Sequence, residues 1–337
     1  MTIMSNKFLL FFLMPFLISA VGCDRVKEDT QGDEMARFEA WIEVNNLSGY
    51  KTPSGLYYIS EREGTGLSPE DSDIVVYSSV VRNLDGFIYG NTYKDTAKLY
   101  GIYGLYNTTH YAPEVIMYLS KNTVPQGLSD GIGKMKEGGK ARLIMPSSLA
   151  FGEYGSKSIS PYTSLIYDVE LKEVFKGNIL EYEKSIIQKY MTDSAGFLPI
   201  TDTVYRKVKI ASTKLTGVAK DSTVKVNYIG RFLDGFIFDT NIKSVAIDSS
   251  IYVAKKSYSP WEFVVGVEDA SSPLSGFQFA VKQMKEGEKS IFIIPSSYMY
   301  GVNGKNSDET TKIPPYTPLV FEITLVEVIG KKKVGSE

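Results

Sequence analysis

Regular spacing of apolar side chains predicts strands in both halves of the chain. In residues 165–172 the side chains at positions 167, 169 and 171 are apolar or aromatic and those between them are charged, and residues 319–328 show a similar alternation. A period of two is typical of a strand that buries one face of an antiparallel sheet. Residues 224–232 and 290–294 are further apolar stretches that predict strands.

Two other segments have the spacing of amphipathic helices. Residues 34–45 and 179–191 each carry apolar side chains three and four residues apart, with charged side chains elsewhere. We expect the first helix to be a stalk near the N-terminus and the second to connect two domains.

The sequence contains one long pattern twice, 149 residues apart. The hexapeptide LDGFIY at 84–89 recurs as LDGFIF at 233–238, and ten of the 18 positions in 135–152 match their partners in 284–301. After this the offset grows to 154, because the second copy has five extra residues between Gly301 and Pro315. A period this long indicates tandem domains, since the units of a solenoid span about 20–50 residues.

Each copy also contains a short helix, indicated by apolar residues at positions i, i+4 and i+7. These residues are Leu128, Ile132 and Met135 in the first copy and Phe277, Val281 and Met284 in the second. We expect Gly138 and Gly287 to cap these helices in the left-handed conformation. The predicted fold class is α+β: two tandem domains, each an antiparallel β-sheet wrapped on one short α-helix, with a helical N-terminal stalk and linker.

The first 22 residues have the pattern of a signal peptide. Lys7 precedes a run of about eleven mostly apolar residues, too short for a membrane span of about 20. Small residues then lead to Cys23, as in a lipobox, so we expect Cys23 to be lipidated. The predicted division of the chain is therefore signal peptide, 1–22; tether and helix, 23–50; first domain, 51–176; helical linker, 177–200; second domain, 201–330; and basic tail, 331–337.

Composition excludes several classes of function. The 337 residues include 37 Lys and Arg against 39 Asp and Glu, a net charge of −2, which gives no support for nucleic-acid binding. One His and one Cys exclude most Cys/His metal sites, Cys–His dyads, Ser-His-Asp triads and any intrachain disulfide. We expect neither a metal nor another cofactor.

Four motifs of the second copy carry a resemblance to a known family. They are VNYxGxFxDGxxFD at 226–239, GF at 276–277 followed by MxxGEK at 284–289, IPxxxxYG at 294–301, and IPPxxxLVFxI at 313–323. Together, and in this order, they resemble the FK506-binding-protein (FKBP) family of peptidyl-prolyl cis-trans isomerases.

The resemblance implies an aromatic cup between the sheet and the short helix. The positions implied as catalytic are Tyr228, Phe238, Asp239 and Tyr300. The positions implied as substrate-binding are Trp261, Phe263, Leu274, Phe277, Ile313 and Phe321. The family usually has Trp where Phe277 stands. The implied partners are proline-containing polypeptides that are unfolded or folding, and an FK506-like macrolide is a possible ligand.

The first copy departs from this pattern. At an offset of 149, Ser79 replaces Tyr228, Val81 replaces Gly230, Gly90 replaces Asp239, Leu128 replaces Phe277 and Phe151 replaces Tyr300. We therefore expect the fold to persist there and the catalytic cup to be lost.

A Tyr-rich segment of the first copy, residues 91–112, lies where a flap over the cup is expected. It either presents a recognition surface or packs its own rings together. It holds the one histidine, His110, which we expect to be a solvated loop residue.

The leading interpretation is a lipid-anchored prolyl isomerase of a Gram-negative cell envelope, on its periplasmic face or the cell surface. Activity is expected in the second domain, with client binding or positioning in the first. The alternative is a non-catalytic FKBP-like binding or chaperone lipoprotein, and a third class is a cell-surface interaction protein that reuses the fold.

Overall fold

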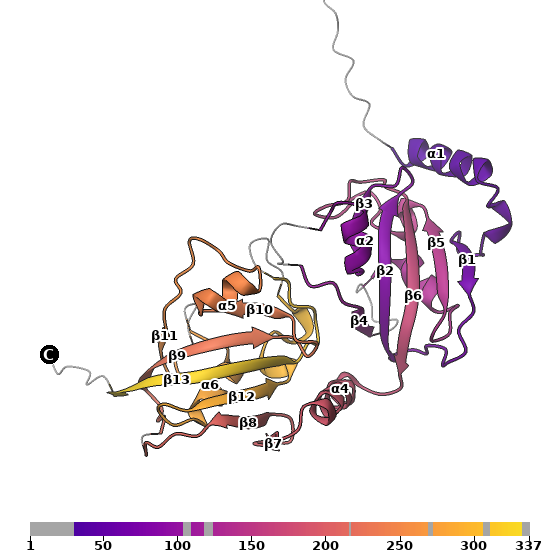
Figure 1. Ribbon diagram of the computed structural model, residues 1–337. Coiled ribbons are helices and arrows are strands. Elements are labelled where there is room, and N and C mark those ends of the chain that lie inside the picture. Colours follow the sequence, from indigo (N-terminus) through magenta and orange to yellow (C-terminus); the bar gives the residue numbers. More distant parts are fainter. Residues whose placement is uncertain are drawn as a thin grey trace, which may run out of the picture.

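The computed structural model describes residues 30–103, 109–117, 124–215, 217–268, 272–305 and 311–331. Cys23 lies outside these residues. Two domains of the same architecture are joined by one helix, α4 (Ile179–Asp193), which lies between them (Figure 1).

Domain 1 is a six-stranded antiparallel sheet preceded by a helix. Its elements are α1 (Gln31–Val44), η1 (Ser48–Tyr50), β1 (Tyr57–Arg62), β2 (Ile74–Asn83), β3 (Ile88–Asn91), α2 (Lys94–Leu99), β4 (Glu114–Met117), α3 (Gln126–Ile132), β5 (Lys140–Met145), η2 (Ser147–Leu149) and β6 (Leu165–Phe175). The strand order is β1-β5-β6-β2-β3, and β4 also pairs with β2. The two long strands β2 and β6 therefore pair with each other in the interior of the sheet.

Domain 2 repeats this arrangement and has a seventh strand, two residues long, at one edge of its sheet. Its elements are β7 (Leu198–Pro199), β8 (Tyr205–Ile210), β9 (Ser222–Arg231), β10 (Ile237–Thr240), α5 (Lys243–Asp248), β11 (Trp261–Val264), α6 (Ser275–Lys282), β12 (Lys289–Ile294), η3 (Ser296–Tyr298), η4 (Gly301–Asn303) and β13 (Leu319–Lys331). The order is β10-β9-β13-β12-β8-β7, and β11 also pairs with β9. The predicted tandem α+β fold is confirmed.

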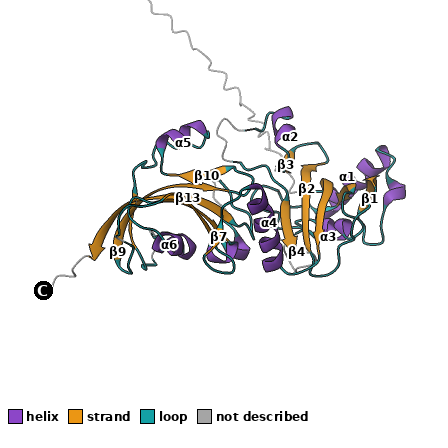
Figure 2. Cartoon of the chain, turned by 60° about the horizontal axis from the view of Figure 1, so that its bottom comes forward, coloured by secondary structure: helices purple, strands orange, loops and turns teal. Residues whose placement is uncertain are grey.

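One short helix covers the inner side of each curved sheet, and Figure 2 shows this for α6. The predicted inner faces of the two alternating strands are buried, with Leu171 and Leu325 fully enclosed. The prediction that Gly138 and Gly287 cap the two short helices is wrong. Gly138 and Gly287 do have φ of 84°. They occupy the turn before the next strand, whereas the helices end at Ile132 and Lys282.

Helix α1 is part of domain 1 and does not project from it as the expected stalk. Phe38 and Ile42 are each 2% exposed and pack against Tyr57, Ile144 and Ile166 on the outer face of the sheet. The helix begins at the N-cap Thr30, whose side chain accepts the backbone N–H of Asp33. The sheet of domain 1 thus covers the apolar face that the sequence pattern predicted for α1.

Helix α4 packs against both domains, so it is more than a connector. Tyr182 contacts Ile74 and Val76 of β2, while Ile187 lies against Ile293 and Val320 of domain 2. A capping box formed by Asn178 and Glu181 fixes where the helix begins. Because two faces of α4 are buried, the helix holds the two sheets in a defined arrangement.

A buried glutamate ties each long helix to its domain. Glu34 of α1 accepts hydrogen bonds from the backbone N–H and hydroxyl of Ser147, at 2.7 and 2.6 Å. Glu183 of α4 accepts the same two bonds from Ser296, the N–H at 2.8 Å. The two glutamates are 149 residues apart in the sequence, and so are the two serines. The repeated unit therefore includes the helix in front of each sheet.

The Glu183 contact predicts a pH dependence of stability. Burial raises the pKa of Glu183 above its ordinary 4.5, although the bonds from Ser296 lower it. Because the pKa of Glu183 is higher in the folded protein than in the unfolded chain, the protonated group adds to the free energy of unfolding below pH 4.5. This contribution is lost as the pH rises through the raised pKa. We expect the wild-type melting temperature to fall relative to that of Glu183→Gln over this range, in thermal denaturation. The exposed Glu39→Gln is the matched control, and a constant difference for Glu183→Gln would contradict the prediction.

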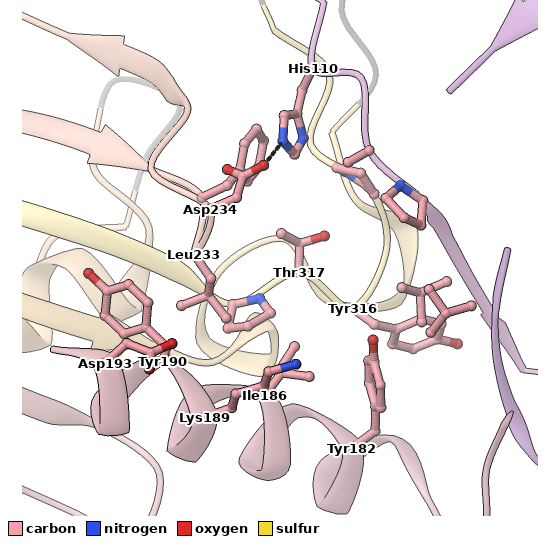
Figure 3. Close-up of a pocket in the computed structure, with 17 residues that line it drawn as sticks. His110, Tyr182, Ile186, Lys189, Tyr190, Asp193, Leu233, Asp234, Tyr316 and Thr317 are labelled. Atoms are coloured by element: carbon pink, nitrogen blue, oxygen red, sulfur yellow. Dashed lines mark hydrogen bonds and ion pairs between the residues drawn. The ribbon is translucent and has the colours of Figure 1, made fainter. Parts of the chain in front are cut away.

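His110 joins the two domains, contrary to the expected solvated position. Its Nε2 lies 2.5 Å from Asp234 Oδ2, and its ring stacks on Phe232 with centroids 4.3 Å apart (Figure 3). Only 11% of the His110 side chain is exposed. Below it, α4 forms the floor of an interdomain cavity of about 520 Å³ that includes Tyr182 and Tyr190.

Candidate functional site

A cluster of aromatic rings lies between the sheet and α6 in domain 2. The ring of Phe277 on α6 is 5.2 Å from that of Phe321 on β13 and 5.7 Å from that of Tyr228 on β9, both edge-on. Trp261 and Phe263 on β11 close the same side, at 5.8 and 6.3 Å from Phe277. Such edge-to-face pairs are favourable beyond the area they bury. The structure thus brings together the rings that the resemblance singled out.

Phe238 completes the wall opposite α6, and a glycine makes room for it. Its ring meets Phe321 at 5.8 Å and 90°. A Cβ on Gly230 would lie 2.6 Å from the tip of the Phe238 ring and 3.1 Å from Phe321. Glycine is therefore required at position 230 by close packing, because any side chain there would displace Phe238.

Tyr228 and Asp239 form the polar centre of this cup. The Tyr228 hydroxyl donates to Asp239 Oδ2 at 2.8 Å, and the backbone N–H of Thr240 donates to Oδ1 at 2.9 Å. Burial, and after it the Asp239 charge, raises the pKa of Tyr228 far above its ordinary value. Tyr228 is therefore a neutral donor at physiological pH, and it fixes the orientation of the Asp239 carboxylate.

Lys256 is a member of the site that sequence reasoning missed. Its ammonium group pairs with Asp239 Oδ1 and lies 6.0 Å from the ring centre of Tyr228 and 5.9 Å from that of Tyr258. Cation–π contact and ion pairing therefore hold the loop between β10 and β11 against the cup. One lysine in a polar insertion carries no sequence signal that distinguishes it from a solvated one.

The other expected positions lie at the floor and the rim. Ile313 is 2% exposed and belongs to the domain core. Tyr300 is partly buried next to that core, and burial, followed by the Asp239 charge, raises its pKa. Leu274 is 37% exposed at the start of α6 and lies outside the core cluster. Leu274 is thus a rim residue, whereas Phe263, Phe277 and Phe321 also serve as core.

Two buried amides, also missed, fix the loops around the cup. The Asn241 side chain accepts the Tyr228 N–H at 2.8 Å and donates to the carbonyls of Val226 and Ser259, each at 2.9 Å. Gln278 similarly accepts the N–H of Gly266 and donates to the carbonyls of Val267 and Pro273. Buried amides with paired donors and acceptors rigidify loops. Only their burial, which the sequence does not show, reveals this role.

The equivalent place in domain 1 is a cavity of about 560 Å³. Its lining residues are Tyr77, Ser79, Val81, Glu114, Val124, Pro125, Leu128, Ala150, Phe151, Tyr154, Gly155 and Tyr167. Ser79, Leu128 and Phe151, which stand in place of Tyr228, Phe277 and Tyr300, all line this cavity. Within the residues that the structure describes, no group of three or more His, Cys, Asp or Glu side chains is placed to hold a metal ion in either domain.

Strand register identifies one further replacement in domain 1. Tyr77 pairs with Glu114 across β2 and β4, and its counterpart Val226 pairs with Trp261 across β9 and β11. Glu114 thus stands where domain 2 has Trp261. A constant sequence offset misses this, because the loop before the short strand differs in length by two residues.

Comparison with known proteins agrees with this geometry. The model of the family described as FKBP-type peptidyl-prolyl cis-trans isomerase matches residues 104–172 and 216–326, more than half of the chain. The chain belongs to this FKBP family. The two matched segments fall in the two domains, so both copies are FKBP domains.

Individual relatives match parts of the chain. FKBP-type peptidyl-prolyl cis-trans isomerase FkpA of Escherichia coli is 32% identical over 151 residues, 44% of this chain and 49% of that protein. A short-type peptidyl-prolyl cis-trans isomerase of Methanocaldococcus jannaschii is 36% identical over 85 residues, 25% of this chain and 52% of that protein. This chain thus spans about half the length of these relatives.

Among solved structures, the crystal structure of Escherichia coli FkpA aligns with 43% of this chain and 61% of that chain, at 27% identity and a TM-score of 0.35.

Proposed function

We propose that this protein is a peptidyl-prolyl cis-trans isomerase whose activity resides in domain 2. The observation that carries the proposal is the cup of Tyr228, Phe238, Phe277 and Phe321 around the hydrogen-bonded Tyr228–Asp239 pair. Membership of the FKBP family supports the class of reaction. The substrates are proline-containing polypeptides, and an FK506-like macrolide would occupy the same cup.

The chemistry needs no cofactor. The barrier to rotation about a peptide bond is about 18–20 kcal/mol, and it comes from the amide resonance that is lost when the bond twists. Apolar walls exclude water from the amide and favour the twisted form, in which charge separation is smaller. A millionfold acceleration requires only about 8 kcal/mol. The proline ring would pack on Phe277, while the Tyr300 hydroxyl would donate to a substrate carbonyl.

An assay of prolyl isomerisation on the full chain tests this function. Catalysis of a short proline peptide above the uncatalysed rate is the expected result. A rate equal to background in the well-folded protein would exclude the enzyme and favour the non-catalytic binding protein instead.

For domain 1 we propose client binding without catalysis. Ser79, Gly90 and Leu128 replace the Tyr, Asp and Phe of the domain 2 cup, so the placed donors and the aromatic floor are lost. A cavity of about 560 Å³ nevertheless remains, within the range of ligand pockets.

We also propose that the protein is anchored in a bacterial envelope through a lipid on Cys23. None of the helices in the described residues has the length and hydropathy of a membrane-spanning segment. Cys23→Ser is expected to move most of the protein from the membrane fraction to the soluble fraction, because it removes the acylated thiol. Fractionation of cells checks this, with Ser19→Ala as a control, and an unchanged membrane fraction would contradict it.

A further inference from the structure

The cavity of domain 1 combines one carboxylate with several aromatic rings. Among its lining residues, Glu114 is the charged one, and Tyr77, Phe151, Tyr154 and Tyr167 contribute rings. The Tyr77 hydroxyl donates to Glu114 Oε2 at 2.7 Å. Tyr77 is 2% exposed, so this bond anchors the carboxylate from a rigid, buried side chain.

Among the residues that the structure describes, Glu114 has no partner of opposite charge. Its hydrogen-bond partner there is the neutral Tyr77 hydroxyl. Burial, and after it Glu114, raises the pKa of Tyr167, and the same causes raise that of Tyr77. Both phenols therefore stay protonated, and Glu114 is the one acidic side chain among the lining residues.

Domain 2 shows that this combination is a property of domain 1 alone. Where Glu114 stands, domain 2 has Trp261, and where Tyr77 stands it has Val226. In domain 2 the charge at the cup, Asp239, is paired with Lys256. The two cups of one repeat therefore differ in the ligand they suit: an apolar ring in domain 2 and a cation in domain 1.

We propose that the domain 1 cavity binds an arginine side chain of a polypeptide, with the guanidinium group on Glu114 among the rings of Tyr77, Tyr154 and Tyr167. A guanidinium group forms paired hydrogen bonds with a carboxylate and stacks on aromatic faces, which ammonium does less well. Tyr154 is 86% exposed and lines the cavity at its rim. The inference rests on the proposed client-binding role of domain 1, and it names the side chain that is recognised.

Isothermal titration of the full chain tests this with three proline-free ligands. They are a capped alanine peptide with one central arginine, the same peptide with neutral citrulline in that place, and propylguanidine as the free side-chain analogue. The arginine peptide is expected to bind about tenfold or more tightly than the citrulline peptide, since the charge-assisted contact is lost in the latter. Weaker binding of propylguanidine would show that the polypeptide contributes contacts.

Two variants locate the binding. Glu114→Gln keeps the shape and removes the charge, so the arginine peptide should bind it no better than the citrulline peptide does. Asp85→Asn, an exposed carboxylate in the turn before β3, removes the same charge elsewhere and should keep the preference. Tyr77→Phe, which frees the carboxylate to rotate, should weaken binding by about threefold.

Equal affinity of the wild-type chain for the arginine and citrulline peptides would overturn the proposal, and this comparison needs no variant. An arginine preference that survives in folded Glu114→Gln would overturn the assigned site. Propylguanidine binding as tightly as the peptide would overturn a polypeptide as the ligand. Prolyl isomerisation is measured separately, so arginine binding without turnover would remove the catalytic proposal alone.

Discussion

The double variant Asp239→Ala with Tyr300→Phe is expected to lower kcat/KM for a proline peptide by about tenfold or more. Losing about 1.4 kcal/mol of transition-state stabilisation has this effect. Asp239 accepts hydrogen bonds from Tyr228 and Thr240 and pairs with Lys256, so its removal frees the loop that closes the cup. Loss of the Tyr300 hydroxyl removes a neutral donor at the rim. The measurement is catalysed isomerisation read against the uncatalysed rate.

The matched control makes the same two kinds of substitution in domain 1. Asp95 and Tyr100 are exposed on and next to α2, so Asp95→Ala with Tyr100→Phe should leave kcat/KM within about twofold of wild type. Full activity in the domain 2 variant would show that these groups do not stabilise the twisted amide. A loss in the control alone would place the activity in domain 1.

A domain 2 fragment without α4 is expected to lose most of its stability. Residues 194–331 would expose Ile293 and Val320, which are 0% and 2% exposed when Ile187 covers them. Each such side chain contributes about 1.5–3 kcal/mol by its burial. The Ser296 N–H would also lose its acceptor, Glu183. The loss is a large part of the roughly 5–15 kcal/mol that stabilises a typical domain.

The matched fragment begins at Asn178, so that it keeps α4 and its capping box. Urea denaturation should show a cooperative transition for residues 178–331 and a much lower midpoint, or none, for residues 194–331. Ile187→Ala in the longer fragment should lie between them, with a loss of about 2–5 kcal/mol. Equal midpoints would mean that α4 is only a linker, as the sequence pattern by itself suggested.

The two domains illustrate how one repeat supports different sites. The inner-face leucines, the short helix and the Glu–Ser contact recur in both, because they maintain the fold. The residues that line the two cups have been exchanged, and both domains keep the fold. Tyr228 against Ser79 and Trp261 against Glu114 are such exchanges.

The sequence by itself determined the repeat, the fold class and most of the cup. Strand alternation and helical spacing report which side chains are buried, because burial imposes those periods. The motif residues Tyr228, Phe238, Asp239, Phe277 and Phe321 meet in space because they lie at fixed places on consecutive elements of one domain.

Only the tertiary structure decided the contacts between elements far apart in the chain. The pairing of Lys256 with Asp239, of Glu183 with Ser296 and of His110 with Asp234 depends on loop paths and on how α4 packs against both sheets. No local pattern encodes such contacts, since a charged residue in a polar segment reads as solvated. The place of Glu114 in the domain 1 cavity likewise follows from strand register, which pairing across the sheet fixes and residue counting does not.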